Sequence, residues 1–228
     1  LSQIRGPLNT VAVPVLSKLQ NDDDRFQDYV AKGQMAIGYT IVAGLALVAG
    51  SAGALVDVLL GPTWQDATDV LRLLAVAGAL TTLSYVGYWV YVTKGLVNHL
   101  LRYTFISAGI RVVSIVTGSN FGLLGIAAAV AIAPAIAWPL SLWWLSRRAS
   151  IPIRRLWLGG VRIIVFCGAI VVVTFPLDHV LVAQPALLRL VLEVLAAAAT
   201  YAVMALAVPV YRRDIGAVIT TVRASIGR

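Results

Sequence analysis

Long apolar blocks dominate this sequence, and they restrict what the chain can fold into. A helix needs about 20 mostly apolar residues to cross the ~30 Å hydrocarbon core of a bilayer, and six blocks here reach that length. Hydrophobic residues make up 60% of the chain and charged residues 12%, whereas soluble domains carry roughly 25% charged residues. Prolines and glycines within these long runs favour helices over the short alternating strands of a barrel. We therefore predict an all-α polytopic membrane protein.

The block boundaries predict six complete transmembrane helices and one partial helix. The apolar stretch at 7–19 is too short to cross, and it lacks the basic start and the cleavage site of a signal peptide. We interpret it as the end of a helix in a longer protein. The predicted spans are 35–60, 69–92, 96–117, 121–146, 157–177 and 187–210. The predicted organisation is a truncated helix at 1–20, a cytoplasmic connection at 21–34, a six-helix bundle at 35–210 and an amphipathic cytoplasmic tail at 211–228.

Lys and Arg fall on alternate connections and predict the orientation. They gather before the first complete span, around 93–102, at 147–162 and in the tail, whereas the turns at 61–68, 118–120 and 178–186 have none. Positive residues mark the cytoplasmic side, so we expect the C-terminus in the cytoplasm and these three turns outside. This sorting also accounts for the net charge of +8, so we expect no nucleic-acid partner.

Small residues recur every four positions in the span 121–146. Such rows allow close approach of helices in a membrane, where no hydrophobic driving force exists between them. Two prolines in the same span can bend it. We expect a tightly packed, bent helix, with these small residues in contact with its neighbours: Gly125, Ala129, Ala133 and Ala137 in one row, and Ala127, Ala131 and Ala135 in the other.

One cation lies deep in a predicted span. Arg111 is about 15 residues into 96–117, and a charge at that depth is costly unless it faces a bundle interior or a hydrated cavity. Thr104, Ser107 and Ser114 lie on the same helical face. We interpret this face as a cavity wall; the alternative is that Arg111 extends toward the headgroups. Tyr85 and Tyr88 form a weaker polar stripe on the preceding span. We expect Arg72 to pair with Asp69 or Asp57.

Catalytic and metal-binding patterns are absent from the sequence. It has no P-loop, dinucleotide fingerprint or His-Glu zinc helix, and His99 and His179 fall near opposite faces of the predicted membrane. Asp66 and Asp69 are interpreted as acids that stabilise a helix N-terminus. We therefore expect no enzymatic activity, no metal and no cofactor.

Three stretches, in order, resemble the polysaccharide exporter (O-antigen flippase) branch of the multidrug/oligosaccharidyl-lipid/polysaccharide exporter superfamily. They are "VPVLSKLQNDDDRFQDY" (13–29), "LLGPTWQDATDVLRLLA" (59–75) and "GLLGIAAAVAIA" (122–133). The first is similar to a helix end with its cytoplasmic loop, the second to a Gly-x-x-Trp outer turn, and the third to a Gly-rich helix start. "TKGLVN" (93–98) departs from the family pattern, in which a Gly-Arg pair is common.

The resemblance implies that the chain is the second bundle of a 12–14 helix exporter. Such exporters move polyprenyl-linked oligosaccharide to the outer leaflet of the cytoplasmic membrane by alternating access, for surface polysaccharide or lipopolysaccharide biosynthesis. The implied partners are the lipid-linked oligosaccharide, membrane lipids and the missing N-terminal half. Three alternatives remain open. They are a drug or metabolite antiporter, with Asp57 and Glu193 as candidate ion-coupling acids; a membrane enzyme of polysaccharide assembly; and a non-transporting scaffold.

Overall fold

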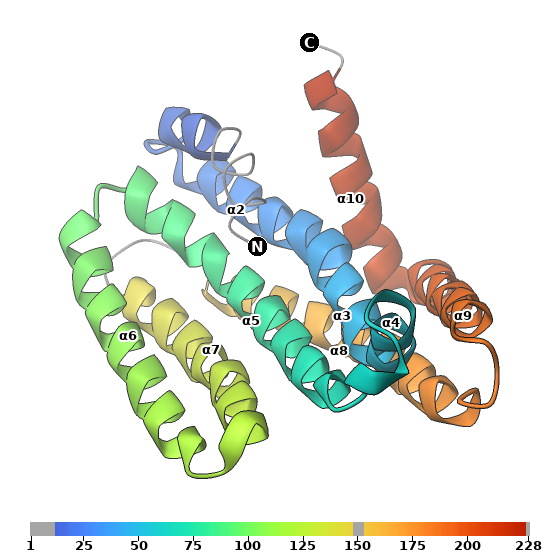
Figure 1. Ribbon diagram of the computed structural model, residues 1–228. Coiled ribbons are helices and arrows are strands. Elements are labelled where there is room, and N and C mark those ends of the chain that lie inside the picture. The colour runs from blue at the N-terminus through green and yellow to red at the C-terminus, as the bar shows by residue number, and fades with distance from the viewer. Residues whose placement is uncertain (1–11, 148–152, 227–228) are drawn as a thin grey trace.

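The computed structural model describes residues 12–147 and 153–226, and side chains as far as residue 218. Every regular element in these ranges is a helix (Figure 1). Six helical segments are long and apolar enough to cross a membrane, which confirms an all-α polytopic membrane protein. The elements are α2 (Asp23–Ile37), η1 (Gly38–Val42), α3 (Ala43–Gly50), α4 (Ala52–Leu59), η2 (Pro62–Trp64), α5 (Ala67–Thr93), α6 (Val97–Ser119), α7 (Gly122–Ser146), α8 (Ile153–Val180), α9 (Ala186–Ala207) and α10 (Pro209–Ile226).

The first span begins earlier than the sequence suggested. Most of the segment predicted as a connection, 21–34, belongs to α2, which continues through η1 and α3 to Gly50. The Asp22 side chain caps α2 by accepting from the Arg25 amide (3.2 Å), and two more acids in the first turn suit the helix N-terminus. Phe26 and Val30 are buried on one side. The charged residues therefore form the exposed face of an amphipathic helix. Of the predicted helix at 1–20, residues 12–18 are helical and residues 1–11 lie outside the described ranges.

The remaining predicted spans correspond closely to α5, α6, α7, α8 and α9. One boundary differs for a clear physical reason. The predicted span 187–210 ends instead at Ala207, because Val208 is extended and Pro209 begins α10. A residue before proline is pushed out of the helical region, since the proline ring collides with its backbone.

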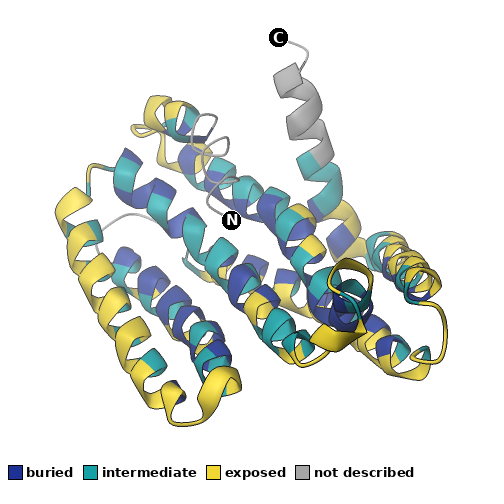
Figure 2. Cartoon of the chain, in the orientation of Figure 1, coloured by how far each residue is buried: buried dark blue, intermediate teal, exposed yellow. Residues whose placement is uncertain are grey.

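The bundle is built around α5 and α7. Helix α7 packs between α5 and α6, α3 packs against α5 and α8, and α8 packs against α9. Helix α6 contacts mainly α7 and is largely exposed along its length (Figure 2). In the small-residue rows of α7, Ala127, Ala129, Ala131, Ala133 and Ala137 are buried, whereas Ala135 is exposed. The rows thus serve mainly for helix contact, as predicted.

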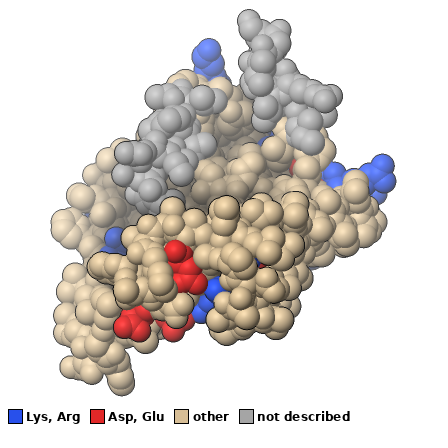
Figure 3. Space-filling view, turned by 45° about the vertical axis from the view of Figure 1, so that its right-hand side comes forward, with Lys and Arg blue, Asp and Glu red and all other residues tan. Residues whose placement is uncertain are grey.

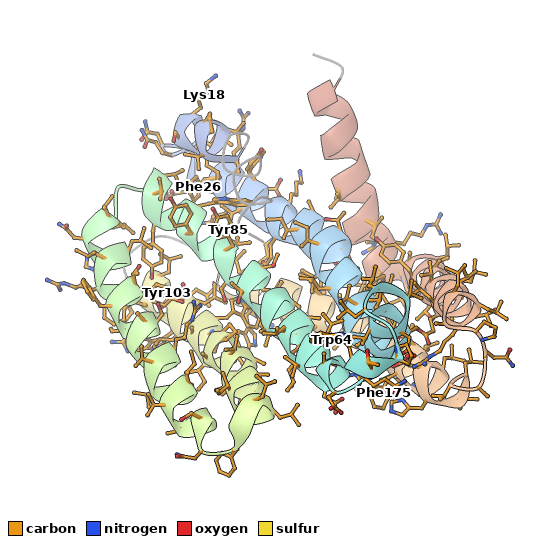
Figure 4. The ribbon with its side chains drawn as sticks, in the orientation of Figure 1. Lys18, Phe26, Trp64, Tyr85, Tyr103 and Phe175 are labelled. Carbon is orange, nitrogen blue, oxygen red and sulfur yellow. The ribbon has the colours of Figure 1, made fainter. Side chains whose placement is uncertain are left out.

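The two ends of the bundle differ in their connections. At one end, Lys94 of the α5–α6 turn donates to Asp23 Oδ1 and to the Gln20 carbonyl, both at 2.7 Å. At the other end, Gly61 adopts a positive φ of 88° that favours glycine, and the exposed Trp64 follows it. Figure 4 shows Lys18 and Phe26 at the first end, and Trp64 and Phe175 at the second. The predicted topology would place the second end outside the cell.

Candidate functional site

The predicted first span, 35–60, is interrupted at Ser51, and the helical segment that is long and apolar enough to cross a membrane ends just before it, at Gly50. Helix α3 ends at Gly50, α4 begins at Ala52, and Ser51 between them has φ −100° and ψ 23°. Ser51 is fully buried, and its side chain does not cap α4. An interruption of this kind leaves carbonyls at the end of one helix and amides at the start of the next without helical partners. Such groups are costly inside a membrane, so they need partners from elsewhere in the bundle.

Two charged residues from other helices supply those partners. Asp178 of α8 accepts hydrogen bonds from the backbone amides of Gly53 (3.1 Å) and Ala54 (3.0 Å), at the start of α4. Arg72 of α5 donates Nε to the Ala49 carbonyl (3.1 Å), at the end of α3. The carboxylate therefore lies at the positive end of one helix dipole and the guanidinium at the negative end of the other.

Asp178 and Arg72 belong to a larger group of charges, which we call the ionic cluster. Arg72 bridges Asp69 (2.7 Å) and Asp178 (3.2 Å). Arg189 of α9 pairs with Asp178 and, through Nη1, with Asp57 of α4 at 3.2 Å. Acidic and basic side chains lie together at the lower end in Figure 3. The ionic cluster ties together α4, α5, α8 and α9, and its members are Asp57, Asp69, Arg72, Asp178, Arg189 and Glu193.

Glu193 is the least satisfied member of the ionic cluster. Its side chain is 0% exposed, and its Oε1 lies 3.4 Å from Arg189 Nε. Its polar neighbours are Arg189, the buried Ser51 hydroxyl and Asp178, and none of them makes a hydrogen bond of good geometry with its carboxylate. The ionic cluster contains four carboxyl groups and two guanidinium groups, so acid is in excess. A buried acid without a complete set of partners is suited to taking up a proton or a cation.

A pocket of about 210 Å³ leads to the ionic cluster. It lies at the end of the bundle that carries the Gly61–Trp64 turn, and Arg72 also stacks over the Phe175 ring there, 4.6 Å from its centroid. The Asp178, Arg189 and Glu193 side chains are therefore buried, whereas Asp69 is exposed, and the ionic cluster can be approached from one face. The pocket is lined by Gly53, Asp57, Gln65, Thr68, Asp69, Arg72, Asp178, His179, Val182 and Arg189.

The residues predicted to line a cavity lie elsewhere, on α5 and α6. Arg111 and Thr104 are exposed on α6, whereas Ser107 and Ser114 are half-buried. The Thr104 hydroxyl donates to the Leu100 carbonyl at 2.8 Å, and Ser107 donates to the Thr104 carbonyl at 3.0 Å. These two hydroxyls therefore donate to carbonyls of their own helix. The charge on this face of α6 comes from the Arg111 guanidinium. Whether this face lines a cavity in the assembled protein stays a prediction.

Tyr85 and Tyr88 are both half-buried on α5. Their rings stack on each other with centroids 5.3 Å apart. Figure 4 places Tyr85 on α5 and Tyr103 on the neighbouring α6. The tyrosines and the α6 stripe therefore belong to adjacent helices, and neither contributes to the pocket beside the ionic cluster.

The sequence located part of the ionic cluster. The expected pairing of Arg72 with Asp69 is confirmed, and the other candidate, Asp57, pairs with Arg189 instead. Asp178 and Arg189 were missed because they flank a turn that looks like an ordinary outer loop. The one available signal was an acid and an arginine placed close to the same turn, each beside a long apolar run.

One comparison with known proteins finds a similarity, over the first part of the chain. A family described as polysaccharide biosynthesis protein matches residues 1–69. This match supports the resemblance to the polysaccharide exporter family. It covers the interrupted first span, including Ser51, Gly53 and Asp57. No curated protein and no solved structure gives a significant match.

Proposed function

We propose that this chain is the second bundle of a membrane flippase that moves polyprenyl-linked oligosaccharide across the cytoplasmic membrane for surface polysaccharide or lipopolysaccharide biosynthesis. The observation that carries this proposal is the interrupted first span, whose two helix ends are held by charged residues of other spans. The match to polysaccharide biosynthesis proteins supports the substrate class. The missing N-terminal half would complete the transport path, and the chain would act as a transporter rather than an enzyme.

An interrupted span suits alternating access for a physical reason. A continuous helix kinks sharply only where its backbone hydrogen-bond ladder is disturbed, whereas α3 and α4 already have separate ends at Ser51. Those ends are held by side chains, and side chains can exchange partners. Intramembrane charges are costly and commonly mark transport pathways, and interrupted spans in secondary transporters commonly lie at the binding site. We infer that α4 can pivot relative to α3 when the ionic cluster changes partners.

The orientation and the place in the cell are part of the same proposal. The alternation of Lys and Arg supports a cytoplasmic C-terminus and an outward-facing pocket beside the ionic cluster. If the pocket faces outward, the ionic cluster lies where the bundle would open to the outside. Its ion pairs could then change partners when the bundle opens.

Arg111 is proposed to contact the anionic pyrophosphate or an acidic sugar of the substrate. A guanidinium binds phosphate oxygens through two parallel donors, and an ammonium group cannot reproduce this geometry. In a flippase-deficient strain expressing the complete transporter, Arg111→Ala should lower export about tenfold or more, the loss expected for one hydrogen bond to a charged group. Arg111→Lys should recover part of this activity. Surface polysaccharide normalised to membrane protein level is the measurement.

Arg102, the other arginine of α6, provides the matched control. It lies one turn into the helix and is exposed, so Arg102→Ala should leave export near normal. Full export by Arg111→Ala would remove the residue from the mechanism. Full export by Arg111→Lys, together with reduced abundance of Arg111→Ala, would instead support a guanidinium that reaches the headgroups.

An antiporter of drugs or metabolites is the second candidate, because Glu193 is a buried acid with few partners. Such a protein couples export to the entry of a proton or cation. If this candidate is correct, Glu193→Gln should abolish dye efflux driven by an ion gradient in vesicles, because the amide keeps the shape but cannot exchange a proton. Asp66→Asn is the control, since Asp66 is exposed and lies outside the ionic cluster and the pocket lining. Absence of gradient-driven efflux in the unmodified protein would exclude the antiporter.

A further inference from the structure

Glu193 of α9 is the only glutamate in the sequence, and it lies where a carboxylate has little support. Its side chain is fully buried, and its one ion-pair contact within the described part of the chain is Arg189 Nε, at 3.4 Å. The Ser51 hydroxyl and the Asp178 carboxylate also face it, and neither makes a hydrogen bond of good geometry with it. Burial of an unpaired carboxylate is costly, and such a group commonly takes up a proton instead.

Arg189 is committed to other acids and cannot fully neutralise Glu193 while it keeps them. Its Nη1 donates to Asp57 at 3.2 Å, and its Nη2 donates to Asp178. Only Nε is left for Glu193, and it makes no hydrogen bond of good geometry. Arg72 likewise pairs with other acids of the ionic cluster. The glutamate is therefore the acid for which no guanidinium is available.

The buried charges of the ionic cluster balance when one acid is neutral. Asp69 is exposed, so water solvates its charge. Three carboxyl groups and two guanidiniums remain inside, with side chains at most 18% exposed: Asp57, Asp178, Glu193, Arg72 and Arg189. Asp178 accepts from two backbone amides and two guanidiniums, and Asp57 accepts from a guanidinium and a side-chain amide. Donors of this kind favour the ionised form, so the neutral acid is Glu193.

We propose that Glu193 holds a proton, and that the presence of this proton decides which acids Arg189 binds. With the proton in place, the Glu193 O–H donates to the Asp178 carboxylate, and Arg189 stays with Asp57 and Asp178. When the O–H bond breaks, the proton passes to water in the pocket, which Asp178 lines. The new carboxylate then draws Arg189 away from Asp57. Because Asp57 lies on α4, loss of the proton releases α4 from α9.

A proton suits this position better than a metal cation. The Arg189 guanidinium lies 3.4 Å from Glu193 Oε1, so a metal ion bound to that oxygen would face a positive charge at short range. A metal ion also needs several oxygen ligands, whereas a proton needs one. The proposal concerns proton binding and the partners of Arg189, and it does not depend on what the protein transports.

The single glutamate allows a test without any substitution. The full chain is synthesised cell-free with glutamate that carries an isotope label in its side-chain carboxyl group, so that solid-state NMR in lipid reports Glu193 alone. At neutral pH, this carboxyl should resonate as a protonated acid, and it should shift to the carboxylate position only in alkaline buffer. Aspartate labelled in the same way is the control, because exposed acids such as Asp66 should be carboxylates in both buffers. A carboxylate signal from Glu193 at neutral pH would overturn the proposal.

The release of α4 is tested as a distance between helices. Spin labels on Leu59→Cys of α4 and Leu187→Cys of α9, both exposed, should move apart between neutral and alkaline buffer in a Cys167→Ser background. Glu193→Gln has no proton to lose and should keep the shorter distance in both buffers. Asp66→Asn, outside the ionic cluster, should leave the response intact. An unchanged distance without these two substitutions, or an equal response in Glu193→Gln, would show that proton loss does not move Arg189.

Discussion

Replacing Asp178 with alanine is expected to lower the free energy of unfolding by about 3–5 kcal/mol, the range observed when one partner of a buried ion pair is removed. The Asp178 side chain is 2% exposed, pairs with Arg72 and Arg189, and accepts the amides of Gly53 and Ala54. Its loss would leave the buried Arg189 and the half-buried Arg72 short of a partner, and the start of α4 without its cap. Denaturant titration of the purified protein in mixed micelles measures the change.

Asp69→Asn is the matched control for Asp178→Ala. Asp69 also pairs with Arg72, but its side chain is 63% exposed, and exposed ion pairs contribute only about 0–1 kcal/mol. Asp178→Asn should fall between the two, because the amide oxygen can still accept one backbone hydrogen bond. If Asp178→Ala destabilised the bundle no more than Asp69→Asn, the ionic cluster could not be what holds the interrupted span together.

Adding a methyl group at Gly125 should separate α6 from α7. The ideal Cβ would overlap the Gly118 carbonyl oxygen, and a Cβ at Gly118 would overlap the Gly125 carbonyl in turn. Both obstacles are backbone atoms, so no side chain can move aside. Overpacking typically costs about 1–3 kcal/mol, and we expect Gly125→Ala near the upper limit. Unfolding titrations, together with cross-linking between cysteines placed on α6 and α7, would report the lost stability and the wider spacing.

Gly109→Ala, on the partner helix α6, is the control for this steric argument. A Cβ at Gly109 would meet no atom within 4 Å. Alanine is also favoured over glycine inside a helix by about 0.5–1 kcal/mol, so this variant should be neutral or slightly more stable. Equal destabilisation by both substitutions would show that helix propensity or lipid contact, rather than the α6–α7 crossing, controls the response.

The apolar blocks by themselves determined the membrane class and most of the spans. Length and hydrophobicity act locally, because each span must satisfy its own backbone hydrogen bonds inside the bilayer. The same local logic predicted that the small-residue rows of α7 would contact neighbouring helices, and it offered Asp69, three positions away on one helix, as one of two partners for Arg72. The segment 21–34 was predicted as a connection, but most of it is helical. An amphipathic helix with many acids has a composition similar to that of a loop.

Only the tertiary structure brought the ionic cluster together. Asp57 and Arg189 are 132 positions apart, and Gly53 and Asp178 are 125 apart, so no helical period or local spacing connects them. The interruption at Ser51 was equally hidden, because its neighbours are ordinary small and apolar residues. The break is tolerated because Asp178 and Arg72 satisfy the free helix ends, and those contacts exist only after α5 and α8 have packed beside the first span.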